Sequence, residues 1–204
     1  MEQLDTANNI AILCGTAPQP PKFSHTGGAE DYVTFPLEIE RLSGAVDRIN
    51  IVARAAAAEK LEFVGSPRLY IVGEVRSFNN KSGEGSRLVI TVFARELRYA
   101  EAADENSVHL RGALCKPPTL RRTPMGRLIC DVMLAVNRRY GRSDYLPCIA
   151  WGRIAQELSA RTVGDVIEID GRIQSRGYIK TTPDGSEERT AYEVSVISLT
   201  GEGA

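Results

Sequence analysis

The residues best suited to chemistry lie together in one short segment of the second half of the chain. Arg138, Arg139, Tyr140, Arg142 and Tyr145 fall within eight positions, so planar rings and permanent positive charges are interleaved. Aromatic rings offer flat faces to nucleobases, and guanidinium groups attract phosphates. This combination is the chemistry needed to hold an unpaired nucleic acid strand.

Two further aromatic residues follow downstream. Trp151 lies six positions after Tyr145, and an even spacing along a β-strand places both side chains on the same face. Tyr178 begins a segment that turns at residues 183–185, a Pro-Asp-Gly sequence typical of a hairpin. Trp151 is the only tryptophan and follows an apolar run, so a place in the core is the alternative to base stacking. The same two roles are open to Tyr178.

Positive charge is concentrated around these aromatic residues. Residues 111–153 carry nine basic and two acidic side chains, a local net charge of +7, whereas residues 1–104 carry 11 basic and 14 acidic ones. A positive field confined to one segment is typical of a polyanion-binding surface, although a solvated turn is the alternative for the arginine run. We expect the phosphates to be followed by Arg121, Arg122, Arg127, Arg138, Arg139, Arg142, Arg153, Arg172, Arg176 and Lys180.

The two halves of the chain repeat each other. A constant offset of 97 positions, which becomes 98 after one insertion, pairs identical residues over much of the length. The pairs include Leu13 with Leu110, Gly15 with Gly112, Arg41 with Arg138, Asp47 with Asp144, and Gly73 with Gly171. A period near 100 residues is the size of a whole domain. We therefore predict two domains, residues 1–103 and 104–204.

Each copy has the pattern of a β-domain with one short helix. In the second copy, strands are predicted over residues 108–114, 128–137 and 144–151, then a helix over 152–160, then strands over 166–173 and 191–199. The first copy follows with a helix over 55–61 and strands over 69–77 and 87–97. This order predicts a mainly β fold of two tandem five-stranded OB-fold barrels, each with one short helix between strands three and four.

The stacking candidates are confined to the second copy. At the equivalent positions of the first copy, Ser43, Arg48, Arg54 and Asn80 stand where the second has Tyr140, Tyr145, Trp151 and Tyr178. Arg48 and Arg54 could still contact phosphates or stack as planar guanidinium groups. The first domain is therefore expected to lack stacking aromatics and to contribute weaker binding or mainly assembly.

The sequence gives no sign of a catalytic or metal centre. The four cysteines form no Cys-x-x-Cys pair, and His25 and His109 lie in different copies, so we expect free thiols, no cofactor, no metal and no enzyme activity. No apolar run approaches the roughly 20 residues needed to span a bilayer. The acidic N-terminus lacks the features of a signal peptide, so a cytoplasmic, nucleoid-associated protein is expected.

Three segments of the second copy resemble the bacterial single-stranded DNA-binding proteins. They are residues 138–153 (RRYGRSDYLPCIAWGR), residues 164–178, and residues 192–196 (YEVSV). The resemblance covers nearly all of the second copy, with the motifs in the same order and spacing. It implies that Tyr140, Tyr145, Trp151 and Tyr178 stack bases. It also implies four OB-folds in the assembly, and hence a homodimer of this two-copy chain.

One feature departs from that family. Its members commonly end in a long flexible segment with an acidic tip that recruits other replication proteins, whereas this chain ends at Ala204, shortly after its last predicted strand. We therefore expect the acidic recruitment tail to be absent and partners to be recruited by another route. The primosomal replication proteins, which resemble tailless OB-folds of the same lineage, are an alternative family.

Together these features predict a protein that binds and protects single-stranded DNA by base stacking and phosphate contacts, in replication, recombination or repair. Two alternatives use the same fold, namely a primosomal restart accessory protein and an RNA- or protein-binding OB module used for assembly. A nuclease is the alternative from the enzymes, and it would need a carboxylate cluster or a histidine–nucleophile pair.

Overall fold

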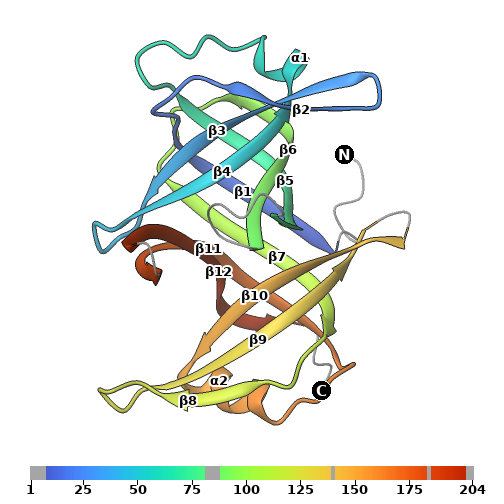
Figure 1. The fold of residues 1–204 in the computed structure, drawn as a ribbon, viewed down its shortest axis with the longest axis vertical. Coiled ribbons are helices and arrows are strands. Elements are labelled where there is room, and N and C mark those ends of the chain that lie inside the picture. Colours follow the sequence, from blue (N-terminus) through green and yellow to red (C-terminus); the bar gives the residue numbers. More distant parts are fainter. Residues whose placement is uncertain (1–7, 81–87, 139–140, 183–184, 201–204) are drawn as a thin grey trace. The chain divides into compact units, whose positions relative to one another are not determined.

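The computed structural model describes residues 8–80, 88–138, 141–182 and 185–200, and its fold is mainly β, as predicted (Figure 1). The first copy contains β1 (Asn9–Thr16), β2 (Lys22–Gly27), β3 (Glu30–Glu40), β4 (Val46–Arg54), α1 (Ala55–Ala58), β5 (Arg68–Asn79) and β6 (Leu88–Tyr99). The second contains β7 (Glu105–Leu114), β8 (Thr119–Arg122), β9 (Leu128–Asn137), β10 (Ser143–Trp151), α2 (Gly152–Ser159), β11 (Val166–Thr182) and β12 (Gly185–Thr200). Neither described helix is long and apolar enough to cross a membrane.

The chain divides into two compact units, which do not follow the repeat in every part. The C-terminal unit comprises Met1–Ile10, Val108–Gln174 and Tyr192–Ala204. The N-terminal unit comprises Ala11–Ser107 together with Ser175–Ala191. The distal part of the β11–β12 hairpin, which belongs to the second copy in sequence, is therefore grouped with the first copy in space.

The strands of each unit are joined in the same way. In the N-terminal unit the order is β2-β3-β4-β6-β5-β1, and β1 also pairs with β3. In the C-terminal unit the order is β7-β11-β12-β10-β9-β8, and β7 also pairs with β9. The extra pairing connects the two ends of a run of five strands in each unit. It leaves β2 and β8 as additional strands at the edge.

These edge strands account for a difference from the prediction. Within the described residues each copy has six strands, and its helix follows the fourth. The four residues of β8 are all exposed, and so are the first five of β2, so neither segment has the alternation of apolar and polar residues that reveals a strand in sequence. The predicted strands are those that bury one face.

Two glycines shared by the repeat permit the closing contacts. A methyl group at Gly112 on β7 would lie 2.5 Å from the carbonyl oxygen of Ala135 on β9, which is closer than real side chains approach. Gly15 on β1 meets the carbonyl oxygen of Glu38 on β3 in the same way. The strands can therefore come together here only because neither residue has a side chain.

The core lies on one face of each sheet. On β10 the inward-facing residues Asp144, Leu146, Cys148 and Ala150 are buried, and the outward-facing Ile149 is buried as well. Complete burial raises the pKa of the Cys148 thiol to about 12, with a smaller contribution from the negative charge of Glu193. All four cysteines are free, as the sequence predicted.

Candidate nucleic-acid interface

The outward face of β10 carries the two best-placed aromatic residues. Tyr145 is 51% exposed and Trp151 is 42% exposed, while the inward-facing Leu146 and Ala150 are fully buried. The even spacing expected from the sequence therefore places both rings on one face, and Trp151 does not belong to the core. Six residues of extended strand separate them, a distance of about 20 Å.

Small or apolar neighbours leave both rings accessible. On β9, Ala135 lies directly opposite Tyr145, and Ile129 lies opposite Trp151. Side chains of directly opposed residues are close enough to touch, so the buried Ile129 can support one side of the indole. Trp151 therefore has an apolar neighbour on β9 and remains open to solvent, as a base-stacking ring must be.

The turn after β10 fixes where Trp151 points. Trp151 is the last residue of the strand, with extended backbone (φ −125°, ψ 149°), and Gly152 then adopts a left-handed φ of +60°. A residue with a side chain is strained in that conformation, whereas glycine is not. The chain turns at once into α2, which buries Ala155 and Leu158 against the sheet.

Four arginines of the C-terminal unit are free to attract anions. They share exposed side chains, and no ion pair joins any of them to another residue in the described ranges: Arg122, Arg127, Arg142 and Arg153. Arg122 and Arg127 lie at the β8–β9 hairpin, Arg142 lies just before β10, and Arg153 lies in the first turn of α2. Arg142 and Arg153 thus lie at the two ends of the strand that carries Tyr145 and Trp151.

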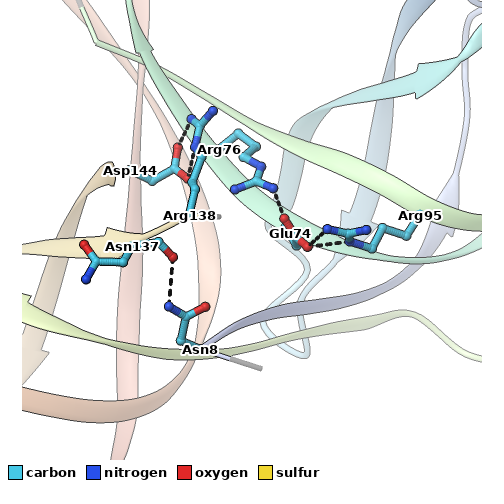
Figure 2. Close-up of polar contacts among 7 residues, drawn as sticks. All are labelled: Asn8, Glu74, Arg76, Arg95, Asn137, Arg138 and Asp144. Atoms are coloured by element: carbon cyan, nitrogen blue, oxygen red, sulfur yellow. Dashed lines mark hydrogen bonds and ion pairs between the residues drawn. The ribbon is translucent and has the colours of Figure 1, made fainter. Parts of the chain in front are cut away.

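Two other predicted phosphate residues are already engaged. Arg138 donates from Nε to Oδ2 of Asp144 at 2.6 Å and from Nη2 to Oδ1, and Asp144 is completely buried (Figure 2). Arg121 on β8 pairs with Asp131 on β9, with Nη2 3.1 Å from Oδ1. This hydrogen bond also raises the pKa of the Arg121 guanidinium.

The Arg138–Asp144 pair belongs to the repeated turn. Its counterpart in the first copy is Arg41–Asp47, where Arg41 Nε lies 2.7 Å from Asp47 Oδ2 and Asp47 is again buried. The first copy has the same backbone bond across the turn, from Arg41 N to Ala45 O, as the second has from Arg138 N to Arg142 O. The constant offset between the copies was the sequence signal that could have revealed this structural role.

The remaining predicted residues are placed as follows. Tyr140 and Arg139 lie outside the described residues, and Lys180 lies in β11 with its side chain outside them. Arg172 is half-buried, and Gln174, in the amide orientation that satisfies both groups, accepts from its Nη2 at 2.9 Å and Nε at 3.0 Å. Arg176 is exposed on β11.

Tyr178 is 37% exposed and lies in the segment that groups with the N-terminal unit. This segment is attached to β4 at its start. The backbone N–H of Ser175 donates to Asp47 Oδ1 at 2.8 Å, and the backbone N–H of Arg48 donates to Ser175 Oγ at 2.9 Å. The structure therefore places Tyr178 with the first copy, three residues beyond this attachment.

The N-terminal unit has a group of aromatic side chains of its own, in which His25 is exposed and Tyr32 and Phe93 are half-buried. The rings of His25 and Tyr32 are stacked, with centroids 4.8 Å apart and an interplanar angle of 10°. Tyr32 lies 6.0 Å from Phe93, and the guanidinium carbon of Arg54 lies 5.9 Å from the centre of the Phe93 ring. Comparison of equivalent positions missed this group, because its aromatic residues occupy other strands than those of the second copy.

Comparisons with known proteins identify the family of the chain. Residues 105–200 match the model of the Single-strand binding protein family. Over 100 residues the chain is 34% identical to "Single-stranded DNA-binding protein 2" of Streptococcus agalactiae, a match that covers 46% of this chain and 72% of that protein. The chain belongs to the single-strand binding protein family.

A second relative is the "Single-stranded DNA-binding protein" of Oceanobacillus iheyensis, 32% identical over 100 residues, which are 46% of this chain and 59% of that protein. The chain thus spans less than two thirds of the length of this relative. The solved structure of the single-stranded DNA binding protein from Thermus aquaticus has a TM-score of 0.76 at 21% identity and covers 96% of this chain and 93% of that one. The similarity of fold therefore includes both copies.

Proposed function

We propose that this protein binds and protects single-stranded DNA without catalysing a reaction, in replication, recombination or repair. The observation that carries the proposal is the outward face of β10. It presents Tyr145 and Trp151 on one side of a strand, next to exposed arginines that have no ion pair within the described residues. Membership of the single-strand binding protein family supports the choice of ligand. Such a ligand would place the protein with the nucleoid in the cytoplasm.

Each copy, residues 1–103 and 104–204, forms an OB-fold barrel in this proposal. The pairings of β1 with β3 and of β7 with β9 support it, because each connects the two ends of a five-stranded run. The similarity of fold to the Thermus aquaticus protein supports it as well. OB-folds bind oligonucleotides on an exposed sheet face, which is the face where Tyr145 and Trp151 lie.

The DNA would be held by two kinds of contact. Successive bases stack on Tyr145 and Trp151, with Tyr140 and Tyr178 as further stacking candidates, and each stacked base contributes about 1–3 kcal/mol. Phosphates are attracted by the exposed cations: Arg122, Arg127, Arg142, Arg153 and Arg176, with Arg139, Arg172 and Lys180 as further candidates. Arg121 and Arg138 act as positioning residues, because each is bound to a carboxylate.

The assembly follows from the number of OB-folds. The resemblance to this family implies an assembly of four, so we propose a homodimer of this two-copy chain. Sedimentation equilibrium measures the mass of the assembly directly. A mass of two chains is expected, and a monomer at micromolar concentration would contradict the proposal.

The first test uses the only tryptophan as the probe. Titration of Trp151 fluorescence with oligo-dT of about 30 nucleotides, the length for two OB-fold sites, should quench the emission at low salt. Binding without quenching would remove Trp151 from the interface. Absence of binding, measured by the anisotropy of a labelled oligo-dT, would refute the proposed function itself. Competition with oligo-rU distinguishes a DNA-binding protein from an RNA-binding module.

A further inference from the structure

The N-terminal unit presents a row of side chains across four adjacent strands. His25 on β2 lies opposite Tyr32 on β3, and Tyr32 lies opposite Arg54 on β4. Phe93 on β6, the next strand, contacts both Tyr32 and Arg54. These four residues, His25, Tyr32, Arg54 and Phe93, are called the aromatic row below.

The aromatic row does not serve the core of its unit. The inward residues of β3 and β4, such as Phe35, Leu37, Ile49 and Ile51, are buried and fill the interior without it. The row lies on the opposite face, where His25 is exposed and Tyr32 and Phe93 are half-buried. Planar rings grouped on an outward sheet face, outside the core, mark a candidate binding surface.

The corresponding row of the C-terminal unit also contains an arginine and an aromatic ring, but on different strands. There Arg121 on β8 lies opposite Ile129 on β9, and Ile129 lies opposite Trp151 on β10. In the C-terminal unit the edge strand carries the guanidinium of Arg121, and the third strand carries the indole of Trp151. In the aromatic row the edge strand carries the ring of His25, and the third strand carries the guanidinium of Arg54. Both rows therefore contain one arginine, together with three rings in the N-terminal unit and the single indole of Trp151 in the C-terminal unit. No stacking residue is shared by position.

The charge around the aromatic row differs from that of the C-terminal unit. Arg54 Nε lies 2.8 Å from Glu30 Oε2, and Arg48 Nη1 lies 3.2 Å from Glu38 Oε1. Hydrogen bonds from Arg54 and from Tyr32 lower the pKa of the Glu30 carboxyl, so it stays ionised and retains the arginine. Phosphate attraction is therefore weak here, and the rings must provide most of any affinity.

Beyond Phe93, two arginines share one carboxylate, so their positive charge is only partly offset. Glu74 on β5 lies opposite Phe93 and pairs with both Arg76 and Arg95 (Figure 2). A ligand that needs a strongly positive groove, such as a duplex, would find little attraction at this face. A ligand with exposed planar bases would find stacking partners, which do not depend on net charge.

We propose that the aromatic row is a second contact surface for unpaired nucleobases, which binds single-stranded DNA mainly by stacking and only weakly through phosphates. The choice of single-stranded DNA as the ligand rests on the proposed function. The position of the surface, and the larger share of stacking compared with phosphate contacts, are inferred from the N-terminal unit alone. Of the two roles expected for a first copy without aromatics at the equivalent positions, weaker binding or mainly assembly, the proposal selects weaker binding.

The test moves the fluorescent probe to the N-terminal unit. In the double variant Tyr32→Trp, Trp151→Phe, the only tryptophan lies within the aromatic row, and Phe keeps a ring on β10. Titration with a short oligo-dT of about 10 nucleotides should quench its emission. The matched control is Tyr70→Trp, Trp151→Phe, since Tyr70 also faces an arginine, Arg98, at 4.1 Å but lies outside the row. The control emission should not change.

The outcomes separate the two proposals. Binding by anisotropy without quenching at position 32 would overturn the aromatic row and leave the C-terminal site intact. Absence of binding to the wild-type chain would overturn the proposed function and this inference with it. In a Tyr145→Ala, Trp151→Ala background, residual binding should weaken about 5- to 150-fold for each stack lost by Tyr32→Ala or Phe93→Ala. An unchanged residual affinity would also overturn the inference.

Discussion

Arg138 and Asp144 form a two-point ion pair in which the carboxylate is completely buried and the guanidinium closes the turn between β9 and β10. Asn8 supports the same region, since its Nδ2 donates to the carbonyl oxygen of Asn137 at 2.8 Å (Figure 2). Because Arg41 and Asp47 repeat the pair in the first copy, it is part of the fold of each copy rather than of one binding face. Arg142, four residues beyond Arg138, is instead exposed, and no described residue forms an ion pair with it.

This contrast predicts that the two arginines act on different properties. Arg138→Ala should lower the free energy of unfolding by about 3–5 kcal/mol, because it removes the guanidinium that binds the buried Asp144 carboxylate at two points. Arg142→Ala should change stability by less than about 0.5 kcal/mol, as surface substitutions usually do. Urea unfolding followed by circular dichroism measures both. Equal stability of the two variants would contradict the structural role of Arg138.

Gly112 should be intolerant of even one methyl group. Gly112→Ala places a Cβ 2.5 Å from the Ala135 carbonyl oxygen where β7 meets β9, so the strands must separate. We expect a loss of about 1–3 kcal/mol of unfolding free energy, in the range of other overpacked sites. Gly177→Ala is the matched control, since its Cβ would meet only Glu188 Oε1 at an ordinary 3.7 Å. Similar Tm values for the two variants would contradict the close approach.

The outward face of β10 could be predicted from sequence because it depends on a local rule. The six-residue spacing of Tyr145 and Trp151 fixes their common face once the segment is a strand, and the buried alternation of residues 144, 146, 148 and 150 makes it one. β3, β4, β5 and β7 have this alternation too. β8 lacks it, since Thr119–Arg122 is exposed throughout, and so this strand was not anticipated.

Other features depend on contacts between distant residues and left no local signal. The stack of His25 on Tyr32 requires the register of β2 against β3, which shifts between Phe23 and His25. The attachment of Ser175 to Asp47 joins residues 128 positions apart. The pairing of Arg138 with Asp144 was visible only as two residues repeated at a constant offset, and an arginine next to tyrosines also suits a phosphate contact.

The two exposed rings of β10 should matter for binding and little for stability. Trp151→Ala and Tyr145→Ala should each weaken oligo-dT binding about 5- to 150-fold, the range for loss of one stacked base. Ile197→Ala is a suitable control, because Ile197 is a large apolar residue on β12 that is 62% exposed. Fluorescence anisotropy of a labelled oligo-dT gives the affinities. An effect of Ile197→Ala as large as that of Trp151→Ala would indicate a different face.

The salt dependence of binding should identify which arginines contact phosphates. Each phosphate contact with a single strand adds about −0.7 to the slope of log K against log salt concentration, because binding releases condensed counterions. Arg142→Ala and Arg153→Ala should each make the slope shallower by about 0.7, since no described residue forms an ion pair with either side chain. Arg121→Ala should leave the slope nearly unchanged, because Asp131 already neutralises Arg121.

The salt dependence of binding also distinguishes binding at the C-terminal unit from binding at the aromatic row. Because Glu30 and Glu38 neutralise Arg54 and Arg48, the residual binding of a Tyr145→Ala, Trp151→Ala variant should have a shallower slope than the wild-type chain. A wild-type slope near zero would show that phosphates contribute little anywhere, and stacking alone would then have to account for the affinity. A residual slope as steep as that of the wild type would mean that the ion pairs around the aromatic row open when DNA binds.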